Sequence, residues 1–212
     1  MCRLKRVFLI LLSMLLLSGC VMLKNGKRAV LENNVVLIKN DNLQGSGVLY
    51  RSVGDSVIFV TAAHVVSNAQ KVIVQENKTD RIHLVEGLDL VFLVIDEIKL
   101  SADLKTLADE NAAAADQVQD QLVLKGYDAS GAWLEVDGMR TESWIYVEDF
   151  GCHMMIGKAE AVPGMSGGGV FDQNGNFLGI ICGIDEEGNV AILPASVIAS
   201  EYEVLFGADA EK

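Results

Sequence analysis

The sequence is poor in basic side chains and in cysteines, and it has only one long hydrophobic run. Lysine and arginine number 17 against 29 aspartates and glutamates, which gives a net charge of −12. Such a charge repels phosphate backbones, so nucleic acid is excluded as a partner. The four cysteines show no metal-ligand spacing, and we expect neither a metal site nor a cofactor. Half of the residues are hydrophobic, which indicates a globular body with a substantial core.

The one long hydrophobic run lies at the N-terminus and has the layout of a secretory signal. Arg3, Lys5 and Arg6 precede an almost uninterrupted apolar stretch over residues 7–17. A transmembrane helix needs about 20 apolar residues, and this run is shorter. We therefore expect a signal peptide over residues 1–19, with an uncleaved anchor helix as the alternative.

The end of this run resembles the lipobox of bacterial lipoproteins, in which a cysteine thiol receives a diacylglyceryl group before the peptide bond ahead of it is cut. Residues 17–20 read Leu-Ser-Gly-Cys. The resemblance implies lipidation of Cys20, stable membrane attachment through several acyl chains, and a tether over residues 20–33. The residue after Cys20 is Val21. An aspartate at this position would resemble an inner-membrane retention signal. Its absence favours the outer membrane, with the body facing the periplasm. In a cell with a single membrane, the body would lie on its extracytoplasmic face.

Two cysteines remain in the predicted body, Cys152 and Cys182. An exported protein meets a compartment in which disulfides can form. Both residues lie in apolar, strand-like stretches, and pairing requires a suitable Cα separation that the sequence does not provide. A disulfide and two buried free thiols are both open.

Short β-branched runs separated by turn residues fill most of the chain after Asn34. In the first half we expect strands at residues 35–38, 47–50, 56–61, 71–75, 81–85 and 89–95, with turns at 40–42, 54–55 and 77–80. In the second half we expect strands at residues 122–126, 132–136, 143–147, 152–156, 169–171, 177–184 and 190–193. Such spacing is typical of an all-β barrel or sandwich.

Two segments interrupt or end this pattern. Residues 101–120 contain an alanine run and little alternation, and they are predicted to connect a domain at 34–100 to a domain at 121–212. In the tail, apolar residues recur at helical spacing, which predicts a short amphipathic helix against the body. These apolar positions are Val197, Ile198, Tyr202 and Leu205.

Three short motifs occur in the order histidine, aspartate, serine. Residues 61–66 read Thr-Ala-Ala-His-Val-Val after an apolar strand, Asp89 opens another strand, and residues 163–168 read Pro-Gly-Met-Ser-Gly-Gly. Taken singly, each has an ordinary explanation as a structural histidine, a strand cap, or a loop that needs unusual φ values. Their joint occurrence in this order favours a catalytic function.

The chemistry requires these residue types. A serine hydroxyl is a weak nucleophile until an imidazole accepts its proton, and a carboxylate fixes the imidazole tautomer and stabilises the imidazolium. Ser166, His64 and Asp89 are the predicted nucleophile, base and orienting acid. The glycines beside Ser166 allow a tight turn in which the amides of Gly164 and Ser166 form an oxyanion hole.

On these motifs the chain resembles the trypsin-like peptidases, and more closely the bacterial branch that includes the HtrA proteases and the glutamyl endopeptidases. Residues 44–47, Gln-Gly-Ser-Gly, are similar to the glycine-containing strand before the histidine in that branch. The resemblance runs from about Val35 to the end. It implies an all-β fold of two antiparallel six-stranded barrels with the triad between them, followed here by the short C-terminal helix.

Departures from the family pattern affect regulation and specificity. Met165 replaces the aspartate that pairs with a freed N-terminal amine in digestive members, so that mode of activation is not expected. By resemblance, the substrate lies along Ile181, Cys182 and Gly183, which favours cleavage after small or medium apolar residues. The acidic residues 185–187 follow directly, and attraction of a basic side chain is the alternative.

We expect a membrane-anchored serine endopeptidase acting on exported proteins or peptides. The alternative is a chaperone-like or peptide-binding lipoprotein that keeps the fold with little turnover. A purely structural lipoprotein would leave the three motifs unexplained.

Overall fold

The computed structural model describes residues 34–40, 43–67, 69–96 and 120–207. The predicted signal peptide, Cys20, the tether at 20–33 and almost all of the connection at 101–120 lie outside the described residues. Residues from Asn34 onward belong to one compact unit. In the described ranges, no helix combines the length and the apolar character needed to cross a bilayer.

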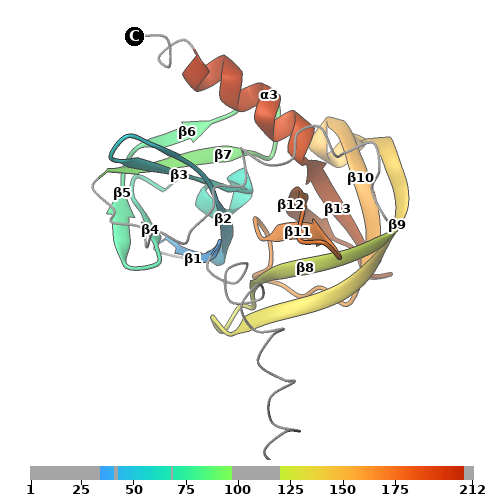
Figure 1. The fold of residues 1–212 in the computed structure, drawn as a ribbon. Helices are drawn as coiled ribbons and strands as arrows, with labels where there is room; N and C mark the ends of the chain where they lie inside the picture. Colours follow the sequence, from blue (N-terminus) through green and yellow to red (C-terminus); the bar gives the residue numbers. More distant parts are fainter. Residues whose placement is uncertain (1–33, 41–42, 68, 97–119, 208–212) are drawn as a thin grey trace, which may run out of the picture. The chain divides into compact units, whose positions relative to one another are not determined.

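The first half of the body is one antiparallel sheet (Figure 1). Its strands are β1 (Val35–Lys39), β2 (Gln44–Val53), β3 (Ser56–Thr61), β4 (Val72–Val74), β5 (Asn77–Thr79), β6 (Ile82–Leu84) and β7 (Val91–Asp96). They lie in the order β5-β4-β1-β2-β3-β7-β6. Alternate side chains point into a core that includes Ile38, Leu49, Phe59 and Leu93, as expected for short half-buried strands.

This sheet has one strand more than the six that were predicted. Residues 77–80 were interpreted as a turn, but Asn77–Thr79 pairs with β4 as strand β5. The turn lies earlier, where Gln75 adopts a positive φ of 57°. Thr79 is buried and donates a hydrogen bond to the Val94 carbonyl, so contacts distant in sequence outweigh the low strand propensity of this segment.

The second half is a closed six-stranded antiparallel barrel. Its strands are β8 (Gln121–Tyr127), β9 (Trp133–Val147), β10 (Cys152–Ala159), β11 (Gly169–Asp172), β12 (Phe177–Ile184) and β13 (Asn189–Pro194). They close in the order β10-β13-β12-β11-β8-β9 around a core that includes Leu122, Met155, Ile181 and Ile192. The predicted all-β class with two barrel-like halves is confirmed.

The predicted strands at 132–136 and 143–147 are one continuous strand, β9. The predicted break between these strands, which contains Gly138, is wrong. In the structure a side chain at this glycine would lie 3.0 Å from the Lys158 carbonyl oxygen and 3.0 Å from the Ala159 Cβ atom. Gly138 therefore permits β9 to cross close to β10 instead of ending the strand.

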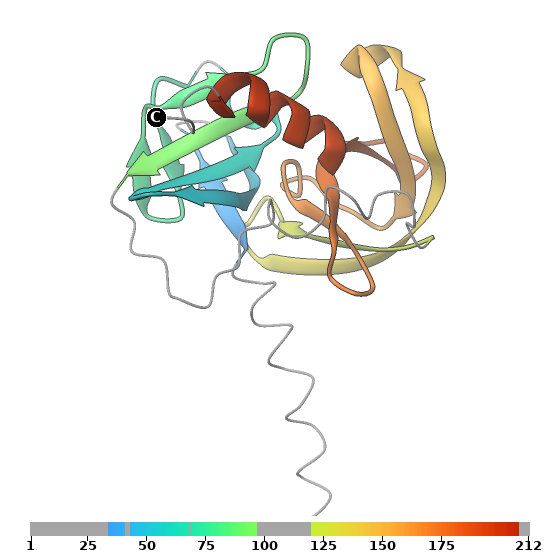
Figure 2. The same cartoon turned by 45° about the horizontal axis from the view of Figure 1, so that its top comes forward.

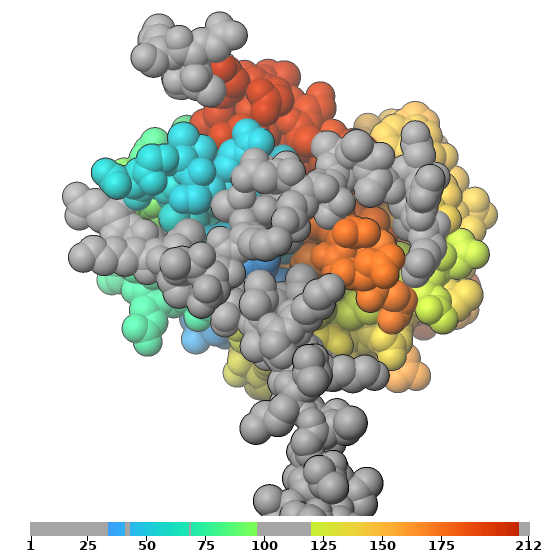
Figure 3. Space-filling view, viewed as in Figure 1, coloured from blue at the N-terminus to red at the C-terminus, as the bar shows by residue number. Residues whose placement is uncertain are grey.

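The predicted C-terminal helix is confirmed as α3 (Ala195–Phe206). It follows β13 of the barrel and packs aromatic side chains against the first sheet, where Tyr202 contacts Tyr50 and Phe92 with ring centroids 5.5 and 6.0 Å apart. Figure 2 shows the helix passing from the barrel to the first sheet, and Figure 3 shows its atoms directly beside that sheet. The helix thus ties the two halves together.

The contact of α3 with the first sheet includes His83, whose surroundings favour the neutral imidazole. His83 of β6 lies 5.2 Å from the Phe206 ring, and its Nε2 atom is buried with no hydrogen-bond partner within the described part of the chain. Burial, and to a smaller extent Arg81, lowers the pKa of His83. As the pH falls, the unfolded chain therefore takes up the proton first.

We expect the free energy of unfolding to decline as the pH falls from the unfolded pKa of about 6.5 towards the lower folded pKa of His83. Urea unfolding at a series of pH values between 7.5 and 5 would measure this decline. His83→Gln, which cannot be protonated, should flatten it. An equally steep decline in the variant would exclude His83 as the cause.

Candidate active site

His64 is carried by a short 3₁₀ turn, η2 (Ala63–Val66), directly after β3. Val65 and Val66 of this turn are buried in the core of the first sheet, which fixes the turn. The His64 side chain points the other way and is 48% exposed. The sequence therefore anchors the turn through its apolar residues and leaves the imidazole accessible for chemistry.

Asp89 precedes β7 and meets His64 through both carboxylate oxygens. Its Oδ2 atom lies 2.8 Å from Nδ1 of the imidazole, and its Oδ1 atom accepts a hydrogen bond of 2.9 Å from the His64 backbone N–H. A carboxylate facing Nδ1 favours the proton on that nitrogen, which leaves Nε2 as an acceptor. Two of the predicted catalytic residues are thus adjacent, with the geometry required of a base and its orienting acid.

Asp96, the acidic residue at the far end of β7, is part of a surface network. Its Oδ1 atom accepts hydrogen bonds from the Ser56 hydroxyl at 2.5 Å and from the Arg81 guanidinium at 2.6 Å. The hydrogen bond from Ser56, followed by that from Arg81, lowers the pKa of Asp96. It has no contact with His64 among the interactions of the described residues.

The predicted nucleophile, Ser166, lies in a tight turn that is fixed on both sides. Met165, directly before it, is fully buried in the barrel core. Directly after it, the Gly167 N–H donates to the Ile181 carbonyl at 2.7 Å, and the Ile181 N–H donates to the Gly168 carbonyl at 2.9 Å. The Met165 that replaces the family aspartate thus serves as an apolar anchor for the serine turn.

Ser46 joins this turn to the first sheet, a role that sequence reasoning did not assign to it. This fully buried residue of β2 donates its N–H to the Ser166 carbonyl at 2.8 Å and its hydroxyl to the Gly164 carbonyl at 2.9 Å. The Ser46 hydroxyl also accepts the Tyr127 N–H of β8 at 2.8 Å. The only sequence signal for this role is the position of Ser46 in the motif at residues 44–47, which indicates a glycine-containing strand and no function for the serine.

The serine turn lies close to the histidine turn. A side chain at Gly167 would come within 3.0 Å of the backbone nitrogen of Ala62, two residues before His64. The hydrogen bonds of the described residues do not include one from the Ser166 hydroxyl to His64. In unliganded active sites this bond is often long and tightens only when substrate binds.

Two glycines of the serine turn adopt conformations that other residues avoid. Gly164 has a φ of 99° and Gly167 a φ of 80°. A side chain at Gly164 would collide with the backbone of Asp128 and Ala129. Glycine is therefore required at the first predicted oxyanion residue for steric as well as conformational reasons.

A depression of about 610 Å³ opens beside His64. Its lining consists of Ala63, His64, Gly87, Leu88, Asp89, Asp149, Phe150 and Cys182. Of the three predicted substrate-binding residues, Cys182 lines the depression and Gly183 lies under the ring of Phe150. The side chain of Ile181 is buried in the barrel core, and its N–H and carbonyl are bonded to Gly168 and Gly167 of the serine turn.

Both cysteines of the body are free thiols. The Cys182 thiol donates to the Asp89 carbonyl, with the sulfur 3.8 Å from the oxygen. Burial, with a further contribution from the Asp89 charge, raises the pKa of Cys182 and of Cys152. Raised pKa values favour the protonated, weakly nucleophilic form of both thiols.

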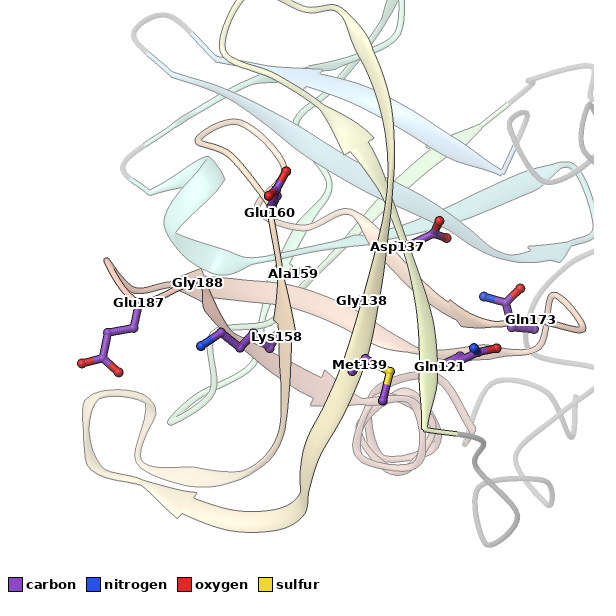
Figure 4. A pocket seen from close by; sticks show the side chains of 10 residues that line it. All are labelled: Gln121, Asp137, Gly138, Met139, Lys158, Ala159, Glu160, Gln173, Glu187 and Gly188. Atoms are coloured by element: carbon purple, nitrogen blue, oxygen red, sulfur yellow. The ribbon is translucent and has the colours of Figure 1, made fainter.

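The acidic residues that follow β12 do not border this depression. Asp185 accepts the N–H groups of Glu187 and Asn189 at 2.9 and 2.8 Å and therefore stabilises its own turn. Glu187 borders a second hollow of about 830 Å³, shown in Figure 4, where it lies on the same side as Lys158. This arrangement gives no support to recognition of a basic substrate side chain by residues 185–187.

In the ranges that the structure describes, no three histidine, cysteine or acidic residues are grouped so that they could hold a metal ion. The site therefore consists of the His64–Asp89 pair, the serine turn and an open depression. In this arrangement Nε2 of His64 can accept a proton.

A family model described as a trypsin-like peptidase domain matches residues 45–180. An inactive form of Rv3671c from M. tuberculosis is similar in structure, with a TM-score of 0.65, 22% identity and coverage of 90% of this chain and 94% of that one. The HtrA-type protease AlgW with a tripeptide has a TM-score of 0.66 and 19% identity over 84% of this chain and 64% of its own. A serine endoprotease from Yersinia pestis has a TM-score of 0.64 and 20% identity over 81% and 62%. No match was found among curated proteins.

Proposed function

The chain belongs to the trypsin-like peptidase family, and from that membership we propose that it is a serine endopeptidase that uses Ser166, His64 and Asp89. The observation that carries this proposal is the pair formed by His64 and Asp89, joined at 2.8 Å through Nδ1. A carboxylate bound to one imidazole nitrogen prepares the other nitrogen to accept a proton. The serine turn, tied to the first sheet by Ser46, supplies the hydroxyl.

In the proposed mechanism, Nε2 of His64 takes the proton of the Ser166 hydroxyl as its oxygen attacks the scissile carbonyl carbon. The N–H groups of Gly164 and Ser166 stabilise the negative oxygen that develops. His64 then gives the proton to the leaving amine, and an acyl group remains on Ser166. A water molecule, activated by His64, hydrolyses this ester while Asp89 stays ionised throughout.

The substrates of this proposal are extended segments of proteins or peptides. The backbone of Cys182 and Gly183 is the proposed surface for the substrate main chain, because β12 pairs with β11 only up to Ile180 and Gly183 has no side chain. The main chain of a peptide can pair with strand backbone that is free along one edge. AlgW, a similar structure, contains a tripeptide.

We further propose that the enzyme acts at a membrane, to which a lipid on Cys20 attaches it. The support is the lipobox-like sequence at residues 17–20, directly after the basic and apolar signal. The proposed site is the outer membrane facing the periplasm, or the outer face of a single membrane. Mass analysis of the chain from membranes would show the diacylglyceryl group on Cys20.

Intact-mass analysis after treatment with a fluorophosphonate tests the catalytic proposal. This reagent phosphonylates activated serines, so we expect one adduct on the full chain in detergent and none on Ser166→Ala. Ser200→Ala removes an exposed serine of α3 and should keep the adduct. A folded chain without an adduct would contradict the proposal and favour the chaperone-like alternative.

A further inference from the structure

Strands β9 and β10 form a two-stranded arm that extends beyond the closed part of the barrel. Strand β9 pairs with β8 only between Trp133 and Met139. It pairs with β10 further along, up to Val147. Strand β10 in turn meets β13 only from Met155 onward. Figure 2 shows this arm in gold, rising beside α3. Its far end is the 3₁₀ turn η5 (Glu148–Phe150), which Gly151 closes in a left-handed conformation.

The tip of the arm reaches the candidate active site. The Phe150 ring lies over Gly183, where a side chain on the glycine would come within 2.9 Å of the Phe150 Cζ atom. Asp149 and Phe150 both line the depression that contains His64 and Asp89. The tip therefore forms one wall of the space beside the catalytic pair.

The charges around this depression have one sign. Its described lining contains two carboxylates, Asp89 and Asp149, and neither lysine nor arginine. Asp89 is engaged with His64, whereas Asp149 forms no hydrogen bond or ion pair within the described residues. Asp149 thus offers an uncompensated negative charge to whatever enters the depression.

The apolar surfaces beside Asp149 suit a particular side chain. Leu88 and the exposed part of the Phe150 ring can cover an alkyl chain, and Asp149 can receive a positive group at its end. Lysine and arginine combine these two properties, because they bury the stem and keep the charged group in water. A negatively charged side chain in the same space would be repelled by Asp149.

We propose that Asp149 and Phe150 select a lysine or arginine side chain of the substrate near the scissile bond. The inference rests on the proposed function, since it names the substrate class of the same site. It differs from the sequence-based alternative, which assigned basic specificity to residues 185–187. Glu148, the neighbour of Asp149 on the same turn, does not line the depression and provides a matched control.

Peptide cleavage tests the inference. The full chain in detergent is given fluorogenic peptides in which lysine, norleucine or glutamate occupies each of four positions on either side of the scissile bond. At one position we expect kcat/KM to be about fivefold higher for lysine than for norleucine, the size expected of an exposed ion pair. Asp149→Asn should remove this preference, Asp149→Lys should transfer it to glutamate, and Glu148→Gln should leave it unchanged.

Phe150→Ala separates the roles of the two residues. Loss of the ring should lower kcat/KM for the lysine and the norleucine peptide together, with their ratio kept. Absence of a lysine preference in the wild type, or its persistence in Asp149→Asn, would overturn the inference. Each variant is also labelled with the fluorophosphonate: an adduct on Ser166 without a lysine preference rejects only this inference, whereas no adduct on the folded wild type rejects the proposed catalysis.

Discussion

Replacing Asp89 with asparagine should lower kcat/KM about 10⁴-fold, as loss of the orienting carboxylate does in a triad, while the fold is retained. The wild-type Oδ1 atom accepts the His64 backbone N–H, and an asparagine oxygen can keep that bond. The amide NH₂ then faces Nδ1 and favours the proton on Nε2. An imidazole in that tautomer has no lone pair with which to take the proton of Ser166.

Steady-state kinetics with one peptide substrate, together with thermal unfolding, would measure this effect. Asp96→Asn is the matched control, because Asp96 ends the strand that follows Asp89 and binds Arg81 and Ser56 instead of His64. It should retain kcat/KM. If Asp89→Asn kept more than a tenth of the wild-type kcat/KM, the 2.8 Å contact would have no orienting role.

The candidate site could be predicted where local sequence determines it. His64 comes shortly after a strongly apolar strand, and its side chain lies outside the core, as a polar residue at the end of such a strand is expected to do. The glycines around Ser166 predicted unusual backbone angles, and Gly164 and Gly167 have positive φ values. These features depend on a few neighbouring residues and on backbone sterics.

Features that depend on packing between distant segments could not be predicted. Strand β5 forms because Thr79 reaches Val94, and Gly138 continues a strand because β10 passes close to it. The position of Phe150 over Gly183 joins the turn η5 to strand β12, and these two segments share no motif. Sequence reasoning consequently placed substrate recognition on residues 181–183 and did not include the tip of the arm.

The two halves of the proposed catalytic site depend on one small set of buried contacts. The Ser46 carbonyl accepts a hydrogen bond of 2.6 Å from the Thr61 hydroxyl, and the Ser46 N–H donates to the Ser166 carbonyl. Ser46 therefore connects the end of β3 to the serine turn. Gly167 lies at this junction. A side chain there would collide with the Thr61 hydroxyl and the Ser46 carbonyl. The relative position of His64 and Ser166 therefore depends on the absence of a single methyl group.

Gly167→Ala should lower the free energy of unfolding by about 4 kcal/mol, which combines the cost of a positive φ with that of overpacking. Gly54→Ala is the matched control, because Gly54 also has a positive φ, of 58°, but nothing lies within 4 Å of an added Cβ atom. It should lose only about 1–2 kcal/mol, the conformational part. Urea unfolding of both variants would separate the two contributions, and equal losses would show that the junction has room for a methyl group.

The same variant tests whether the junction positions the nucleophile. A displacement of about 1 Å at a reacting group can cost about 100-fold in rate. Under conditions where Gly167→Ala is still folded, fluorophosphonate labelling of Ser166 should therefore slow by about that factor, while Gly54→Ala labels at the wild-type rate. Slow labelling in a folded variant would mean that the contacts of Gly167 with β2 and β3 hold Ser166 in reach of His64. Labelling at the wild-type rate would mean that the serine turn keeps its position without them.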